Sequence, residues 1–145
     1  MKRFTFEVSK GRFKIQALVQ EVGQDILVSM WGGTLPHIGA VGMATPRPSL
    51  RDPKKWSATS STFTYVGHKE DLIVKGISEM LAGRLKRKVV VVAGTGRGAD
   101  TAVVATAAPS SRLHELHITE IICKPLETVS WSLTGGPTPP PAVKL

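Results

Sequence analysis

The chain of 145 residues has little cysteine, few aromatic residues and no long apolar run. A single cysteine, Cys123, cannot form an internal disulfide, which agrees with a reducing compartment. The longest apolar runs, around 26–31 and 89–93, are far shorter than the roughly 20 residues of a membrane span, and the N-terminus lacks a hydrophobic signal core. We therefore expect a cytoplasmic protein without a membrane segment.

Acidic residues are also scarce, with 11 against 19 basic ones, so that the formal net charge is +8. Such an excess suggests an anionic partner: nucleic acid, a membrane surface, a phosphorylated ligand or an acidic protein. Nucleic-acid binding usually adds exposed aromatic stacking platforms, yet aromatic residues make up only 6% of the chain and most lie at core-like strand positions. We therefore expect no nucleic-acid partner. The basic residues form three groups: Lys10, Arg12 and Lys14; Arg47, Arg51, Lys54 and Lys55; and Arg84, Lys86, Arg87 and Lys88.

Apolar residues alternate with polar ones in the first third of the chain, which is typical of strands. Three such runs, 4–8, 13–19 and 26–31, are separated by short turns that contain glycine. They predict an antiparallel meander, because parallel neighbours need longer crossovers. A fourth strand contains the unusually small Gly39, Ala40, Gly42 and Ala44, which permit close approach by another backbone or by a flat ligand. We expect a basic, Pro-containing loop over 46–57 and a fifth strand over 59–66.

Apolar residues at helical spacing follow, with Glu70 and Asp71 at the expected helix start, where negative charge is favourable. The predicted stripe consists of Leu72, Ile73, Ile77, Met80, Leu81 and Leu85. The run "KVVVVAG" then predicts a strand buried on both faces. Weaker patterns suggest a helix or strand near 118–122 and a strand near 128–133. The whole predicts one α+β domain over residues 1–135, mainly an antiparallel sheet packed against one long amphipathic helix, and a flexible Pro-rich tail over 136–145.

Two motifs that often carry chemistry are incomplete in this chain. In "VVVVAGTGRGAD" the glycines are evenly spaced, which does not fit the G-x-G-x-x-G fingerprint of dinucleotide-binding proteins and favours a flexible turn. No nucleophile-elbow sequence is present, and Cys123 has no recognisable catalytic motif around it. An independent enzyme is therefore not supported.

His37 and His68 have two readings. Each could be a surface or capping residue, or the two could converge on a proton-transfer or metal site. Asp71 could orient an imidazole, but it suits the helix dipole equally well. A small His-dependent enzyme is thus an alternative, and metal involvement is left open.

The segment between Trp31 and Asp71 combines the bare strand, the arginine-bearing loop and the helix start. A planar ring could rest on the glycine-rich strand beside Trp31 or Trp56. A phosphate would find N–H groups at the helix start and further donors nearby. The candidate phosphate donors are Arg47, Ser49, Ser60 and Lys69. This pattern is that of a site for a phosphorylated aromatic ligand, of which FMN is one example.

Three segments carry a resemblance to a known family: "WGGTLPHIGAV", "ATPRPSLRDPKKWSATSSTF" and "GHKEDLIVK". Over residues 3–94 the chain resembles the LpdD-like prenylated-flavin chaperones, the D-subunit-type proteins associated with UbiD-type aromatic-acid decarboxylases. The resemblance implies a non-catalytic homodimer that binds prenylated FMN, or FMN, and supports its maturation or delivery to a decarboxylase acting on hydroxybenzoate- or gallate-like acids. It also implies an α+β fold similar to proteasome-assembly chaperones, and a flavin prenyltransferase as a further partner. A cofactor-free assembly subunit is the alternative.

The resemblance also implies a set of site residues. We expect Arg47 and Lys69 to contact the phosphate, and His37 or His68 to contact the flavin ring. After Gly94 the family pattern predicts a charged amphipathic helix, whereas this chain is poor in charge at first. The implied cofactor-binding residues are Trp31, Gly32, Gly33, His37, Gly39, Arg47, Ser49, Ser60, His68, Lys69 and Asp71.

Overall fold

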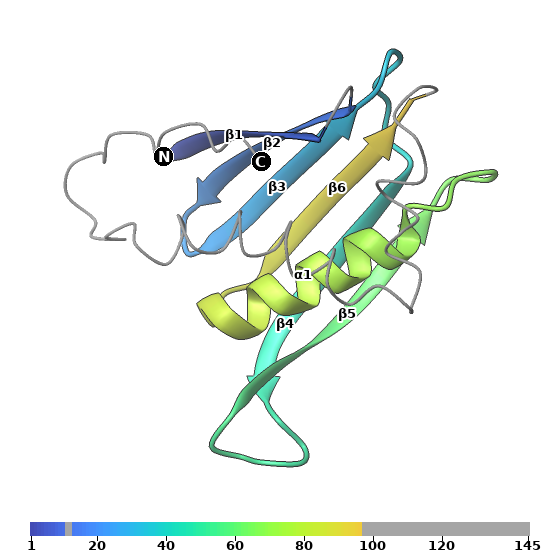
Figure 1. The fold of residues 1–145 in the computed structure, drawn as a ribbon. Coiled ribbons are helices and arrows are strands. Elements are labelled where there is room, and N and C mark those ends of the chain that lie inside the picture. Colours follow the sequence, from blue (N-terminus) through green and yellow to red (C-terminus); the bar gives the residue numbers. More distant parts are fainter. Residues whose placement is uncertain (11–12, 97–145) are drawn as a thin grey trace.

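The computed structural model describes residues 1–10 and 13–96, which form one six-stranded sheet and one helix (Figure 1). The strand order is β1-β2-β3-β6-β4-β5, and every neighbouring pair is antiparallel except β3 and β6. The predicted α+β fold with a mainly antiparallel sheet and an N-terminal meander is therefore confirmed. The elements are β1 (Arg3–Lys10), β2 (Phe13–Val22), β3 (Asp25–Gly32), β4 (Ala40–Pro48), β5 (Trp56–Thr64), α1 (Asp71–Leu85) and β6 (Val89–Thr95).

The order of the strands follows from the lengths of their connections. Gly23, at a φ of 62°, opens the tight turn that pairs β2 with β3, a conformation that suits glycine. Between β3 and β6 the chain first builds β4, β5 and α1, and this long crossover allows β6 to return parallel to β3.

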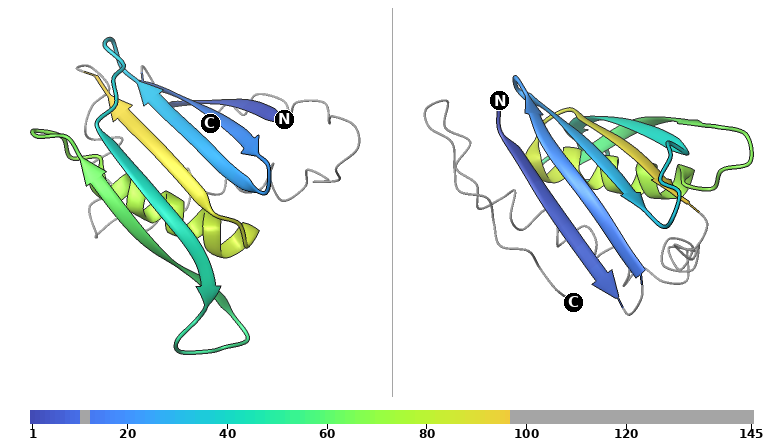
Figure 2. Two further views of the ribbon diagram at one scale, coloured as in Figure 1. Left: turned by 180° about the vertical axis from the view of Figure 1, so that it is seen from behind. Right: turned by 90° about the horizontal axis from the view of Figure 1, so that it is seen from above.

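Helix α1 lies on one face of the sheet, across β4, β5 and β6 (Figures 1 and 2). The core on this face contains alternate residues of β6, namely Val89, Val91 and Ala93. A Cβ atom at Gly42 would lie 2.5 Å from the carbonyl oxygen of Val74, so glycine lets the helix backbone approach the strand. Of the two uses predicted for the bare strand, the structure shows the approach of another backbone.

Three details of the sequence prediction are wrong. Leu72 is 55% exposed, because the buried stripe of α1 passes through Val74, Ile77, Ser78, Leu81 and Ala82. The predicted loop 46–57 is shorter, because β4 continues to Pro48 and β5 already begins at Trp56. Strand β6 is not buried along both faces, since Val90 and Val92 are only half-buried on the face away from α1.

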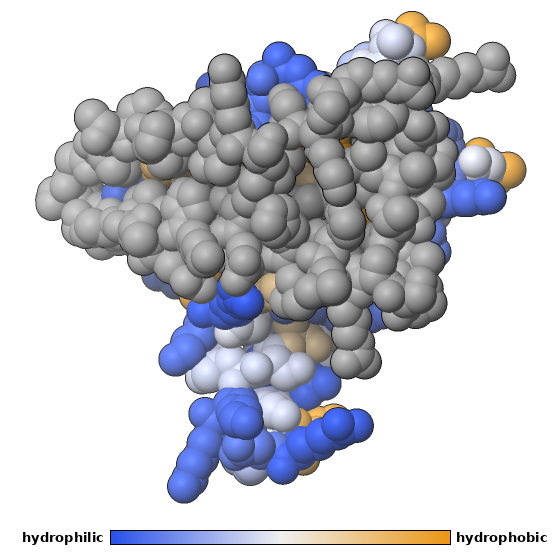
Figure 3. Space-filling model, in the orientation of Figure 1, coloured by the Kyte–Doolittle hydropathy of each residue, from blue (hydrophilic) through white to orange (hydrophobic). Residues whose placement is uncertain are grey.

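Strands β4 and β5 extend as a two-stranded ribbon beyond the rest of the described sheet (Figures 1 and 2). Hydrophilic side chains cover much of this projecting end (Figure 3). No helix in the described part of the chain has the length and apolar composition that a membrane crossing needs. The elements predicted near 118–122 and 128–133, the closing helix and the tail over 136–145 lie outside the described residues.

Candidate functional site

The loop that joins β3 to β4 passes directly over the end of β6. A Cβ atom at Gly94 would lie 1.9 Å from the carbonyl oxygen of His37, and one at Gly96 would lie 2.1 Å from that of Leu35. These two glycines therefore make room for the loop. Gly94 belongs to β6, as the run "KVVVVAG" predicted, so the flexible turn predicted from the spaced glycines does not include it. The Gly96 N–H donates to the carbonyl of Gly32 at 3.0 Å and ties the loop to the strand end.

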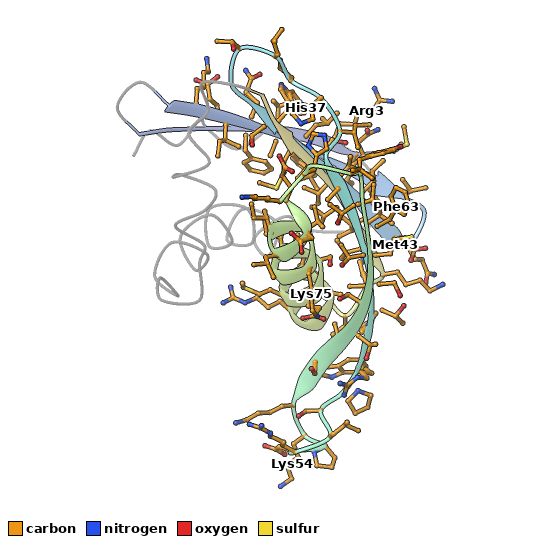
Figure 4. The ribbon with its side chains drawn as sticks, turned by 90° about the vertical axis from the view of Figure 1, so that its right-hand side faces the viewer. Arg3, His37, Met43, Lys54, Phe63 and Lys75 are labelled. Carbon is orange, nitrogen blue, oxygen red and sulfur yellow. The ribbon has the colours of Figure 1, made fainter. Side chains whose placement is uncertain are left out.

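His37, which belongs to this loop, lies next to His68. One of the two interpretations of the histidines in the sequence predicted this meeting. His37 Nε2 lies 3.1 Å from His68 Nδ1, and the ring centroids are 4.6 Å apart. His37 Nδ1 lies 3.1 Å from the carbonyl oxygen of Leu35. Because a carbonyl only accepts, this Nδ1 carries the proton and Nε2 presents its lone pair to His68. Figure 4 shows His37 near one end of the molecule and Lys54 at the other.

Glu70 completes this cluster. It is only 6% exposed, and its Oε2 lies 3.5 Å from His68 Nδ1 and accepts a hydrogen bond from the Lys69 N–H. Its Oε1 accepts from the N–H and the hydroxyl of Thr95. Burial by itself would raise the pKa of Glu70, but the N–H donors of Thr95, Glu70 and Lys69 and the nearby His68 outweigh it and lower the pKa. The carboxylate is therefore ionised at neutral pH.

Gly39 is the position that lets the three side chains approach one another. A Cβ atom there would lie 2.6 Å from Glu70 Oε2 and 3.1 Å from His68 Nδ1. Its N–H donates to the carbonyl of Ala93 and its carbonyl accepts from Tyr65. Hydrogen bonds to β6 and to the segment after β5 therefore hold this glycine against the cluster.

Other predicted site residues surround the cluster or lie away from it. Lys69 is exposed, and Asp71 opens the first turn of α1. Gly32 ends β3, and Gly33 has a φ of 79° as the chain turns into the loop. Trp31 points to the sheet face opposite α1, where its Nε1 donates to the side chain of Gln16 at 2.9 Å.

The remaining predicted phosphate donors are far from the cluster. Arg47 is seven residues along β4 from Ala40, a separation of about 23 Å at the usual rise of a strand. Its Nε donates to Thr59 at 2.6 Å. Ser60 donates to Glu79 on α1 at 2.7 Å, and Ser49 belongs to the loop at the tip of the ribbon. One chain therefore does not bring Arg47 and Lys69 to a common phosphate.

Sequence reasoning missed a groove between the start of β5 and the second half of α1. It has a volume of about 620 Å³. Trp56 is 46% exposed in the wall of the groove, and Lys86 Nζ lies 5.2 Å from the centroid of its ring. The groove is lined by Lys55, Trp56, Gly76, Met80, Gly83 and Arg84, among others. Its residues are distant in sequence, so only the small Gly76 and Gly83 on an otherwise helical stretch hinted at a cleft.

Comparison with known proteins relates this chain to chaperones. Residues 9–95 match the family described as "Prenylated flavin chaperone LpdD-like domain". Over 83 residues the chain is 32% identical to Protein LpdD of Lactiplantibacillus plantarum, an alignment that covers 57% of this chain and 54% of that protein. The chain thus spans about half the length of the curated relative that it matches.

A solved structure supports the fold. The chain superposes with a TM-score of 0.56 on one described as "Crystal Structure of a Novel Chaperone Complex for Yeast 20S Proteasome Assembly", at 9% identity. The superposition covers 86% of this chain and 98% of that one. At this low identity the likeness concerns the fold alone, and it confirms the predicted similarity to proteasome-assembly chaperones.

Proposed function

Since the chain belongs to the LpdD-like prenylated flavin chaperone family, we propose that it is a non-catalytic, cytoplasmic chaperone for prenylated FMN. In this role it supports maturation of the cofactor or its delivery to a UbiD-type aromatic-acid decarboxylase. The observation that carries the proposal is the family match over residues 9–95, which includes every described element from β2 to β6.

The groove between β5 and α1 suits a flavin mononucleotide chemically. Ligand sites of about 300–1,000 Å³ hold molecules of this size, and the groove has about 620 Å³. The exposed side chain of Trp56 offers a flat surface for the flavin ring. On the opposite wall, Gly76 of α1 has no side chain that would fill the groove. Lys55 and Arg84 supply cations for the phosphate. The redox-active ring is cargo in this proposal, and the residues of the chain bind it and shield it.

The helix start suits the phosphate less well than the groove does. The carboxylates of Glu70 and Asp71 lie there, and the N–H of Lys69 is already bonded to Glu70. Like charges oppose a phosphate dianion at this position. We therefore assign the phosphate to the groove in place of the pair Arg47 and Lys69.

A direct binding experiment tests the proposal. The pure protein is mixed anaerobically with reduced prenylated FMN and passed over a sizing column, with co-elution read from the flavin spectrum. We expect retention by the natural chain, and a loss of affinity of about tenfold or more for Trp56→Ala and Arg84→Gln. Lys54→Gln, which removes one charge from the exposed ribbon loop, should bind normally. Retention no greater than that of an unrelated basic protein would contradict the proposal.

The partners are tested separately. We propose a homodimer that binds the UbiD-type decarboxylase and the flavin prenyltransferase, and a pull-down with each purified enzyme tests this. Success with the decarboxylase in the absence of any flavin binding would select the alternative, a cofactor-free assembly subunit. Turnover of a substrate that disappears in His37→Ala while the fold survives would instead identify a small His-dependent enzyme.

A further inference from the structure

The cluster at the start of α1 lies at the opposite end of the helix from the basic groove, and flavin binding in the groove does not use it. We propose that His37, His68 and Glu70 form a site for one divalent transition-metal ion, with zinc as the preferred ion. The proposal does not rest on the proposed function, because it follows from the donor atoms alone.

The spacing of the donor atoms fits tetrahedral coordination. His37 Nε2 and His68 Nδ1 are 3.1 Å apart, and His68 Nδ1 and Glu70 Oε2 are 3.5 Å apart. All three ligand atoms lie within 4.8 Å of one another. Zinc bonds of about 2.0–2.1 Å place neighbouring tetrahedral ligands about 3.3 Å apart. The two shorter spacings therefore match those around a single zinc ion, and the third pair, His37 Nε2 and Glu70 Oε2, lies within 4.8 Å.

The imidazole of His37 is oriented for this role by its second nitrogen. In metal sites the ring nitrogen that does not bind the ion usually donates to a carbonyl or carboxylate, which fixes the tautomer. Here His37 Nδ1 donates to the carbonyl of Leu35, so Nε2 is free to bind through its lone pair. The loop that carries both groups is fixed over Gly94 and Gly96.

The carboxylate of Glu70 is similarly prepared. Thr95 holds Oε1 with two hydrogen bonds, which leaves Oε2 facing His68. A buried carboxylate that is held in this way is oriented before an ion binds. A side chain at position 39 would crowd both donor atoms, since a Cβ there would lie 2.6 Å from Glu70 Oε2 and 3.1 Å from His68 Nδ1. Glycine keeps this space open.

The same atoms could instead form a hydrogen-bonded network. In that arrangement the Nδ1 proton of His68 lies between His37 Nε2 and Glu70 Oε2, and the cluster has a purely structural role. A metal ion would take the place of this proton. Three protein ligands leave a fourth position for water or for an atom of a bound molecule, as in zinc sites with exchangeable ligands. The two arrangements differ in metal stoichiometry and in spectrum, which makes them separable.

Metal titration of the full chain distinguishes them. After treatment with a chelator, the protein is titrated with Zn²⁺ by calorimetry, and with Co²⁺ by visible absorption, which reports tetrahedral geometry. We expect one equivalent per chain, tetrahedral cobalt bands and a rise in Tm with zinc. His37→Ala and Glu70→Gln should each weaken zinc binding by about 100-fold or more, because they remove a ligand and not merely a supporting contact.

Two controls keep the result specific. Glu79→Gln changes a carboxylate of α1 outside the cluster and should bind zinc normally. The double variant His114→Ala/His117→Ala removes the other two imidazoles of the chain and should also bind normally. Should Glu70→Gln fail to fold by circular dichroism, His37→Ala and His37→Gln, which alter the loop residue, decide the question. The proposal is overturned if the natural chain binds no zinc, if binding survives in His37→Ala, or if it disappears in the double variant.

Discussion

At the scale of single residues, Glu70 has a role that its position at a helix start does not reveal. It occupies the N-cap position of α1, but its side chain makes no capping bond to the helix. The carboxylate turns inward to Thr95, which follows 25 residues later at the end of β6. Local sequence explains an acidic residue at a helix start, but only the tertiary structure brings Thr95 to it. Glu70 therefore couples the helix start to the sheet.

Gly39→Ala tests how closely the cluster is packed. The added Cβ would lie 2.6 Å from Glu70 Oε2, a distance that forces the carboxylate or the strand to move. We expect a loss of unfolding free energy of about 1–3 kcal/mol, as for other overpacked sites. Urea unfolding followed by circular dichroism measures this loss.

Gly83→Ala is the matched control for this substitution. Its Cβ would meet Ser57 at an ordinary 3.6 Å, and alanine favours the helix by up to about 1 kcal/mol over glycine. Its stability should therefore be unchanged or higher. If the natural chain and Gly39→Ala were equally stable, the cluster would have room for an extra methyl group, which would contradict the close packing.

At the scale of elements, the approach of α1 to β4 depends on the small strand residues. A Cβ at Gly42 would lie 2.5 Å from the Val74 carbonyl oxygen, a backbone atom that cannot rotate away. Gly42→Ala should therefore push the helix from the sheet and cost about 1–3 kcal/mol of unfolding free energy. Denaturant unfolding measures this loss of unfolding free energy, with Gly83→Ala again as the control. A variant as stable as the natural chain would mean that α1 shifts without penalty.

Helix α1 is also joined to β5 by a polar link among Lys75, Glu79 and Ser60. Burial alone would raise the pKa of Glu79, but bonds from Lys75 and Ser60 and the charges of Lys75 and Arg47 lower it. The unfolded chain thus binds more protons near the usual glutamate pKa of about 4.3. The stabilisation is present above that pH and disappears as the pH falls through the lower folded pKa.

Glu79→Gln tests this pH dependence. The Lys75 and Glu79 side chains are 51% and 33% exposed, so the solvent screens their attraction and the link contributes only about 0.5 kcal/mol. The natural chain should be more stable than the variant by about this amount at pH 7, and the difference should disappear as the pH falls through the lowered folded pKa of Glu79. In a Lys75→Gln background most of the difference should already be absent at pH 7. A difference that persists undiminished in acid would rule out ionisation of Glu79 as its source.

Periodicity in the sequence predicted the first three strands, the bare strand and the helix, because these patterns depend on neighbours a few residues apart. It missed the parallel pairing of β3 with β6 and the rotation of the buried stripe onto Val74, since both depend on distant partners. In the same way, the meeting of His37 with His68 was one of two open readings, and Glu70 was taken only as a helix start. The groove around Trp56 was missed, because Lys55 and Arg84 come together only after α1 packs on β5.

At the scale of the whole molecule, the sheet has a second face with exposed apolar side chains opposite α1. Met43 is 54% and Phe63 61% exposed on this face, and Figure 4 shows both on the side away from Lys75 of the helix. Tyr65 packs edge-to-face on Phe63, with ring centroids 5.2 Å apart. Contiguous exposed apolar side chains are typical of interaction surfaces. We expect this face to pack against a second copy of the chain in the proposed homodimer.

Phe63→Asp tests this interface, because it places a charge where the second copy would exclude water. Light scattering at increasing protein concentration should find a dimer for the natural chain and a monomer for the variant. Thr62→Asp is the matched control, since the neighbouring residue of β5 is exposed but points to the opposite face. It adds the same charge and should leave the dimer intact. A natural chain that stays monomeric at about 100 µM, or equal dissociation by both variants, would exclude this face as the interface. A dimer with a Kd of about 1 µM would be almost fully formed at that concentration.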